Sequence, residues 1–256
     1  MGVVVNTNIS SITASRILSE NRADLEKAME RLASGKRINS AADDAAGMAV
    51  AAKMRADIGS LNQSVRNTND AISLVNTYDG AAAEIESILI RMRELAVQTR
   101  NGTYETADRT NANFEYDALK NEITRIAGVS AFNRMTVGQG SSGAAGGTGV
   151  ADTTFTFYVG SDVAKTGNSI AFAAKALDLN LAVSSGTLNS VADTTNAASA
   201  IATLDDAITE LAANRAQAGA LINRLEHTVS NLMNVSQRLQ EAVSGIEDAD
   251  YAAESA

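Results

Sequence analysis

The fold is decided by residues 44–100, which read DAAGMAVAAKMRADIGSLNQSVRNTNDAISLVNTYDGAAAEIESILIRMRELAVQTR. Apolar side chains recur there at alternating steps of four and three residues, with Thr68 in phase: Met54, Ile58, Leu61, Val65, Ile72 and Val75. That spacing lines up one face of an α-helix. The pattern slips near Gly80 and resumes at Ile85, Leu89, Met92 and Ala96. A single helix over 44–100 would be about 85 Å long, which no compact globule of this mass accommodates.

A shorter amphipathic helix is predicted before this stretch. Its apolar face has heptad-like spacing and consists of Leu18, Leu25, Met29 and Leu32. Gly35 ends the helix, because glycine readily adopts the left-handed conformation found just after a helix. Asp43 and Asp44 are predicted to cap the long helix, since carboxylates accept hydrogen bonds from the free amides of a helix N-terminus.

Two further helices are predicted after the long one. Asn101-Gly102 ends the long helix, and a helix over residues 106–127 then runs antiparallel to it. The apolar positions of this helix are Phe114, Leu119, Ile123 and Ile126. From about Asn196 the helical period returns and continues to the end of the chain. Its apolar positions are Ile201, Leu204, Ile208, Leu211, Ala218, Ile222, Leu225, Val229, Leu232, Leu239, Val243 and Ile246.

Residues 131–190 differ from the rest of the chain because they hold nine of its 18 glycines. Within them, residues 154–159 and 169–172 are predicted strands and residues 141–149 a loop. The predicted fold is mainly α: a long antiparallel helical rod or coiled-coil bundle, formed by the N- and C-terminal segments, with a small inserted β-hairpin. Three parts are expected: 1–40, an N-terminal helix and turn; 41–130 with 196–256, the helical core; and 131–195, a Gly-rich region.

The composition limits both the core and the function. The chain has no Cys, Pro or Trp and only five Tyr and five Phe, which predicts helix interfaces of Ala, Leu, Ile and Val and permits long helices. A formal charge of -9 argues against nucleic acid or an anionic membrane as a partner. No apolar stretch approaches the ~20 residues of a membrane span, and the first residues lack a secretory leader of the general export pathway.

No residue pattern suggests catalysis, a cofactor or a metal. His227, the only histidine, is expected at a surface or helix interface, and one histidine cannot supply a His-Glu-x-x-His zinc motif. The glycines from Gly138 to Gly149 lack the Gly-Lys-Ser/Thr ending of a phosphate loop. Asp43 and Asp44 could suggest a cation site, but a helix cap accounts for both. We therefore expect a protein that is not an enzyme.

Apolar stripes at the two ends of the chain are predicted to drive packing and assembly. Residues 1–40 carry six Lys or Arg against four Asp or Glu, net +2, whereas residues 201–256 carry three against nine, net -6. Attraction between such exposed faces biases pairing more than it stabilises it. The expected assembly and core positions are Leu18, Leu25, Met29, Leu32, Leu61, Val65, Ile72, Leu225, Val229 and Leu232.

Four blocks of sequence carry a specific signal. They are NTNI at 6–9, RLASGKRINSAADDAAG at 31–47, RMRELAVQ at 91–98 and GIEDADYA at 245–252. Together they resemble bacterial flagellin. The resemblance covers about residues 1–135 and 200–256, and four blocks in matching order are far more specific than any one of them.

The resemblance implies a filament subunit of short form. In that family, terminal helices form an inner tube, the long helices surround it, and a variable region points outward. Here the variable region is only the Gly-rich stretch, so large outer domains are expected to be missing. The family also has a further C-terminal helix, which pairs with the N-terminal one, whereas this sequence stops at Ala256.

The resemblance also implies partners and a location. The expected partners are other subunits in a homopolymer, a flagellar export chaperone, the filament cap and the host Toll-like receptor that detects flagellin. Arg91, Leu95 and Glu115 match the receptor-contact positions, although Leu95 also continues an apolar stripe and the two charges could be an ordinary ion pair. The expected location is outside the cell in the flagellum, after type III export.

Two rival readings remain. A hook-filament junction protein shares the terminal helices but assembles in few copies. A secreted adhesin or immune ligand would use the helices to display residues 131–190, and that region would then bind a target when isolated.

Overall fold

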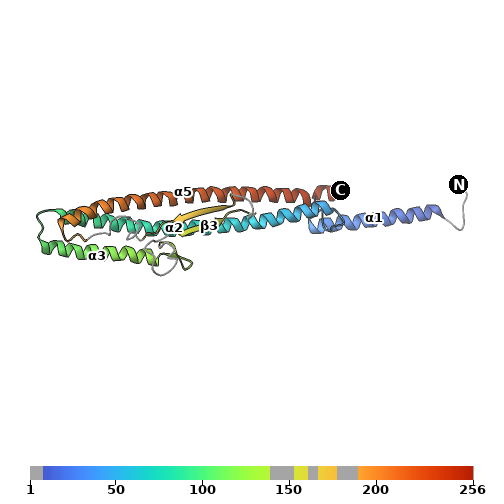
Figure 1. Cartoon of the computed structure of the whole chain (residues 1–256). Coiled ribbons are helices and arrows are strands. Elements are labelled where there is room, and N and C mark those ends of the chain that lie inside the picture. The colour runs from blue at the N-terminus through green and yellow to red at the C-terminus, as the bar shows by residue number, and fades with distance from the viewer. Residues whose placement is uncertain (1–7, 139–152, 161–166, 178–189, 256) are drawn as a thin grey trace. The chain divides into compact units, whose positions relative to one another are not determined.

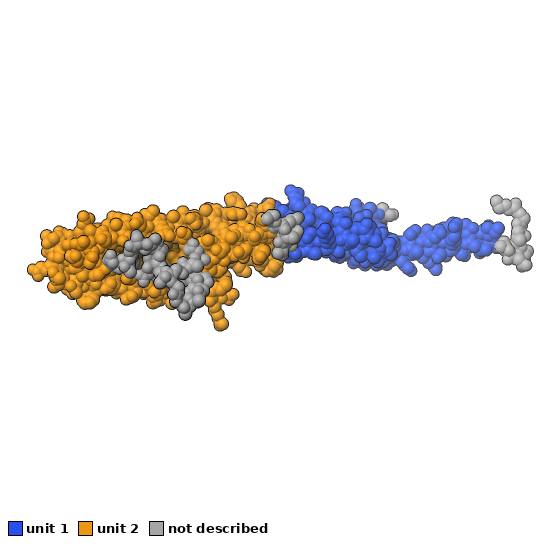
Figure 2. All heavy atoms as spheres, in the orientation of Figure 1, with its two compact units in different colours: residues 1–62, 233–256 blue, residues 63–232 orange. Residues whose placement is uncertain are grey.

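The computed structural model describes residues 8–138, 153–160, 167–177 and 190–255. Helices predominate, with short antiparallel strands between them (Figure 1). The elements are α1 (Ile9–Ser34), α2 (Ala45–Arg100), α3 (Thr106–Val129), β1 (Ala131–Phe132), β2 (Met135–Thr136), β3 (Thr153–Tyr158), β4 (Ser169–Ala174), α5 (Thr194–Glu247) and α6 (Tyr251–Glu254). The chain forms two compact units, unit 1 of residues 1–62 and 233–256 and unit 2 of residues 63–232 (Figure 2).

The predicted long helix is confirmed: α2 has 56 residues. It begins after Asp44, whose Oδ1 accepts a hydrogen bond from the Gly47 amide at 2.8 Å. With no proline in the chain, nothing removes an amide from the helical ladder before Arg100. Of the two predicted caps, Asp44 fills this role, whereas Asp43 closes the preceding turn.

The prediction that the last helix continues to the chain end was wrong. The 54-residue α5 stops at Glu247, and the short helix α6 follows. The Arg37 amide donates to the Glu247 carbonyl at 2.6 Å, and the Ala249 amide donates to the Gly35 carbonyl at 3.0 Å. These long-range bonds replace helical ones, and Asp250 then caps α6.

In unit 2, α2 and α5 run antiparallel. Arg93 of α2 pairs with Asp205 of α5, and Arg215 further along α5 pairs with Asp79 earlier in α2. Helix α3, the β3–β4 hairpin and residues 177 and 191 complete one apolar cluster with them. The predicted slip near Gly80 was wrong. The stripe is continuous there because smaller and aromatic residues fill it, namely Ala71, Leu74, Val75, Tyr78, Ala81, Ala82 and Ile85.

Aromatic residues contribute more to this core than the composition predicted. Tyr78 and Tyr116 are its largest fully buried side chains. The rings of Tyr78 and Phe172 meet edge to face with centroids 5.4 Å apart, and the Tyr78 hydroxyl donates to the Lys175 carbonyl. Burial raises the pKa of Tyr116 to about 12. Phe114, expected on the apolar face of α3, is instead 66% exposed.

The predicted strands are confirmed to within two residues. β3 pairs antiparallel with β4, with Phe155 opposite Phe172 and Phe157 opposite Ile170. Inward and outward side chains alternate along both strands, so one face of the hairpin packs on the core. The β1–β2 hairpin was not predicted, and its turn residues Asn133 and Arg134 have positive φ. The predicted loop at 141–149 lies outside the described residues.

Candidate assembly and recognition surfaces

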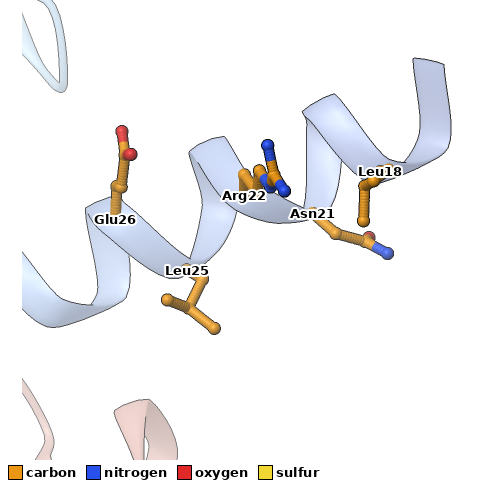
Figure 3. A pocket seen from close by; sticks show the side chains of 5 residues that line it. All are labelled: Leu18, Asn21, Arg22, Leu25 and Glu26. Atoms are coloured by element: carbon orange, nitrogen blue, oxygen red, sulfur yellow. The ribbon is translucent and has the colours of Figure 1, made fainter. Parts of the chain in front are cut away.

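Helix α1 exposes the apolar face that the sequence predicted. It has no buried residue, and Leu18, Leu25 and Met29 are 54%, 60% and 61% exposed. Leu32, near the end of the helix, is half-buried. Figure 3 shows Leu18 and Leu25 on the same side of the helix, within a shallow hollow also lined by Asn21. An uncovered apolar stripe of this length is typical of an interaction surface.

The connection from α1 to α2 is bound to the end of α5. Besides the two backbone bonds at Glu247 and Ala249, the Tyr251 hydroxyl donates to the Leu32 carbonyl at 2.8 Å. The Arg31 guanidinium pairs with Glu254 at 3.2 Å. These contacts join residues more than 200 positions apart in the sequence, so the two ends of the chain fold together in unit 1.

Glu247 is the buried carboxylate at the centre of this junction. Its side chain is 6% exposed, and Arg55 of α2 pairs with it at 2.6 Å. A buried charge without a partner is costly, so the ion pair fixes where α5 ends against α2. Sequence patterns did not single out either residue, because both partners look like ordinary helix-surface charges.

Asp43 organises the turn before α2. Its Oδ2 accepts hydrogen bonds from the backbone amides of Asn39 and Ser40, and Lys27 of α1 pairs with its Oδ1 at 2.9 Å. The Lys27 ammonium and the amides hold the pKa of Asp43 well below its usual range. The Lys27 ammonium therefore takes the position beside Asp43 that a bound cation would take. Among the residues that the structure describes, no group of three potential ligands is placed to hold a metal ion.

The other predicted stripe positions differ in burial. In unit 1, Leu61 is buried. In unit 2, Leu225 and Leu232 are buried, and Leu225 forms a small cluster with Ala71, Val159 and Ile170. Val65, Ile72 and Val229 are half-buried. Leu61, Leu225 and Leu232 are thus buried core residues, in contrast to the exposed face of α1.

Arg91, Leu95 and Glu115 come together in unit 2. Arg91 Nε donates to Glu115 Oε1 at 2.9 Å across α2 and α3, and Arg91 also pairs with Glu94. These carboxylates raise the pKa of the Arg91 guanidinium. The three predicted residues line one polar groove of about 370 Å³, together with Gln98, Tyr104, Asp108, Asn111 and Ala112. Leu95 forms the apolar floor and is only 2% exposed.

The end of α2 and the turn that follows it are held by a residue that the sequence did not single out. Arg109 of α3 donates to the carbonyls of Thr99 and Asn101 at 2.9 and 3.2 Å. A guanidinium at a helix C-terminus satisfies carbonyls that lack helical partners and favours the negative end of the helix dipole. No spacing rule predicts this contact, because it depends on how α3 packs against α2.

None of the described helices is long and apolar enough to cross a membrane.

The sequence of the chain matches those of bacterial flagellins over both of its terminal regions. The family model described as the bacterial flagellin N-terminal helical region matches residues 5–142, and that of the flagellin C-terminal helical region matches residues 201–256. A flagellin of Halalkalibacterium halodurans is 40% identical over 254 residues, covering 98% of this chain and 88% of the relative. The flagellar filament core protein flaB2 of Brachyspira hyodysenteriae is 38% identical with the same coverage of both chains.

Solved structures agree with the sequence relatives. The crystal structure of Bacillus cereus flagellin is 34% identical, has a TM-score of 0.54 and covers 65% of this chain and 88% of that one. A putative flagellar hook-associated protein from Vibrio parahaemolyticus has a TM-score of 0.65 over 80% of this chain and all of the other, but at 11% identity it shows the fold alone. Both terminal regions and close to the full length of named relatives match, so the chain belongs to the bacterial flagellin family, whose members are structural subunits of the flagellar filament.

Proposed function

We propose that the chain is exported through the flagellar type III channel and polymerises outside the cell into the propeller filament used for swimming. The observation that carries the proposal is the uncovered apolar face of α1, centred on Leu18, Leu25 and Met29. Burial of such a face, against the further C-terminal helix of the family and against neighbouring subunits, contributes free energy to assembly. Repetition of one heterologous contact produces an open polymer, not a closed ring.

The proposed polymer assigns a place to each part of the chain. Residues 1–40 contribute to an inner tube, residues 41–130 and 196–256 form the surrounding core, and residues 131–195 face outward. An export chaperone covers the apolar stripes before export, and the filament cap guides insertion at the growing end. The protein has a mechanical role and no catalytic one.

Electron microscopy of purified protein tests the proposal. The chain is examined alone, after seeding with filament fragments, and in a version extended by the C-terminal helix of a related flagellin. The extended version is expected to form filaments. The double variant Leu18→Asp/Leu25→Asp is expected to lose them while its helical circular dichroism is retained. Glu20→Gln, an exposed change on the same helix, is the control. Absence of filaments from the extended, seeded protein would contradict the proposal.

We also propose that the Arg91 groove contacts the host Toll-like receptor that detects flagellin. Arg91 and Glu115 are half exposed and held by one another, so both present charged atoms at the rim of the groove. Arg91→Ala and Glu115→Ala are expected to weaken binding to the purified receptor ectodomain by roughly tenfold each, as removal of a central charged contact does. Arg93→Ala, on the same helix, is the control. Leu95 is left unchanged because its burial makes it part of the core.

A hook-filament junction protein remains the second candidate, favoured by the fold shared with the hook-associated protein. A junction protein assembles in few copies. Seeded growth into long filaments therefore excludes it, whereas growth that stops after a short segment supports it. A display role for residues 131–190 predicts instead that this region binds a target when it is isolated from the helices.

A further inference from the structure

The turn between α2 and α3 contains the only Asn-Gly pair in the sequence, Asn101-Gly102. Both residues are exposed. In such a pair, the backbone nitrogen of glycine can attack the side-chain amide of asparagine, because glycine has no Cβ to obstruct the approach. We propose that Asn101 is a site of spontaneous deamidation, which converts it to aspartate or isoaspartate and alters this turn.

The local geometry leaves the attacking group available. The Gly102 amide makes no hydrogen bond to the described part of the chain, so nothing holds it back from reaction. The Asn101 Oδ1 atom accepts a long hydrogen bond from the Thr103 amide at 3.5 Å. This contact places the side-chain amide over the residues that follow it.

The reaction needs only water. The Gly102 nitrogen loses its proton and bonds to the Asn101 Cγ atom, and the side-chain nitrogen leaves as ammonia. The product is a five-membered succinimide ring. Water then opens the ring at one of its two carbonyls. One opening gives aspartate; the other gives isoaspartate, in which the main chain runs through Cγ and the former main-chain carbonyl becomes a free carboxylate.

Of the two products, isoaspartate changes a main-chain carbonyl that holds the turn together. The Asn101 main-chain oxygen accepts hydrogen bonds from Arg109 at 3.2 Å and from the Tyr104 amide at 3.4 Å. In isoaspartate this oxygen belongs to the free carboxylate and Cβ enters the main chain, so the two hydrogen bonds that join the end of α2 to the start of α3 are expected to change. Tyr104 also lines the Arg91 groove, and deamidation therefore modifies one end of that groove.

A second Asn provides an internal comparison. Asn39 is followed by Ser40, also a small residue, but the Ser40 amide donates to Asp43 Oδ2 at 3.0 Å. Asn39 is half-buried and its side chain donates to the Glu30 carbonyl. The attacking nitrogen and the amide are both engaged there, so Asn39 is expected to persist while Asn101 reacts.

Peptide mass mapping of the full chain, aged in mildly alkaline water enriched in heavy oxygen, tests the proposal. Asn101 is expected to gain heavy oxygen first, with isoaspartate detectable by enzymatic methylation. A Cβ at Gly102 would meet nothing within 4 Å, so Gly102→Ala folds normally and is expected to react roughly tenfold more slowly. An unchanged rate in Gly102→Ala, or loss of the Asn39 amide before that of Asn101, would overturn the proposal.

Discussion

Replacing Arg55 by methionine tests whether the junction between the α1–α2 turn and the end of α5 depends on one ion pair. The change keeps the aliphatic length of the side chain but removes the charge that faces Glu247. Glu247 is 6% exposed and Arg55 48% exposed, so only one partner is buried. The variant therefore leaves a buried carboxylate without its cation.

The expected cost lies between two reference cases. Breaking a fully buried pair costs about 3–5 kcal/mol, because the remaining charge stays desolvated. Exposed pairs contribute only ~0–1 kcal/mol. Since water reaches half of Arg55 and screens the interaction, we expect Arg55→Met to lower the free energy of unfolding by about 1–2 kcal/mol. The loss should fall on unit 1, where both residues lie.

Urea denaturation followed by circular dichroism measures the total loss, and hydrogen exchange of residues 246–254 locates it. Arg238→Met is the matched control, because the Arg238–Glu241 pair is 80% and 51% exposed and its removal should cost less than about 0.5 kcal/mol. Replacing Glu247 by leucine in the Arg55→Met background should recover stability, since no buried charge remains. Equal losses in Arg55→Met and Arg238→Met would refute the assigned role of the pair.

Three further predictions concern the core, the turn and its titration. Leu89→Ala should lower the free energy of unfolding in urea by about 2–5 kcal/mol, whereas Ile90→Ala, next to it but 47% exposed, should lower it by less than ~1 kcal/mol. Equal losses would contradict the placement of Leu89 in the core. Gly47→Ala should destabilise by roughly 1–3 kcal/mol because its Cβ would clash with the capping carboxylate of Asp44, whereas Gly59→Ala, with open space, should be neutral or stabilising in thermal melts. The lowered pKa of Asp43 gives stability that is present above its usual value of 3.8 and is lost only as pH falls through the lower folded value; nuclear magnetic resonance titration checks this, and a midpoint at the usual value would contradict it.

The sequence predicted the long helices and the β3–β4 hairpin because their signals are local. Apolar residues spaced by three and four, without proline, define α2 over 56 residues. Alternation of apolar and polar residues defines the strands, and glycine at 35 marks the end of α1 through its positive φ.

The sequence-based predictions failed where contacts between residues far apart in the sequence determine the structure. The chain is helical up to Glu247 because nothing local stops it; it stops because the 35–37 segment takes up its backbone groups. Likewise, Phe114 and Tyr116 are two positions apart on α3, and only the packing of α3 against the core determines that the tyrosine is buried. Family resemblance suggested Arg91, Leu95 and Glu115, whereas the groove that they line and the contacts of Arg109 and Arg55 needed the structure.

The contacts of Arg215 have a consequence for the alignment of α5 on α2. Its guanidinium bridges Asp79 and Glu86, which lie seven residues apart on α2. Two helices whose apolar pattern repeats about every seven residues can slide along each other by one repeat and still bury similar side chains. A slide in one direction would leave Arg215 with Asp79 alone, and a slide in the other would bring it between Glu86 and Arg93. The first displaced alignment loses one of the two ion pairs, and the second places Arg215 next to another cation. Arg215 therefore favours the native alignment of α5 on α2 over alignments displaced by one repeat.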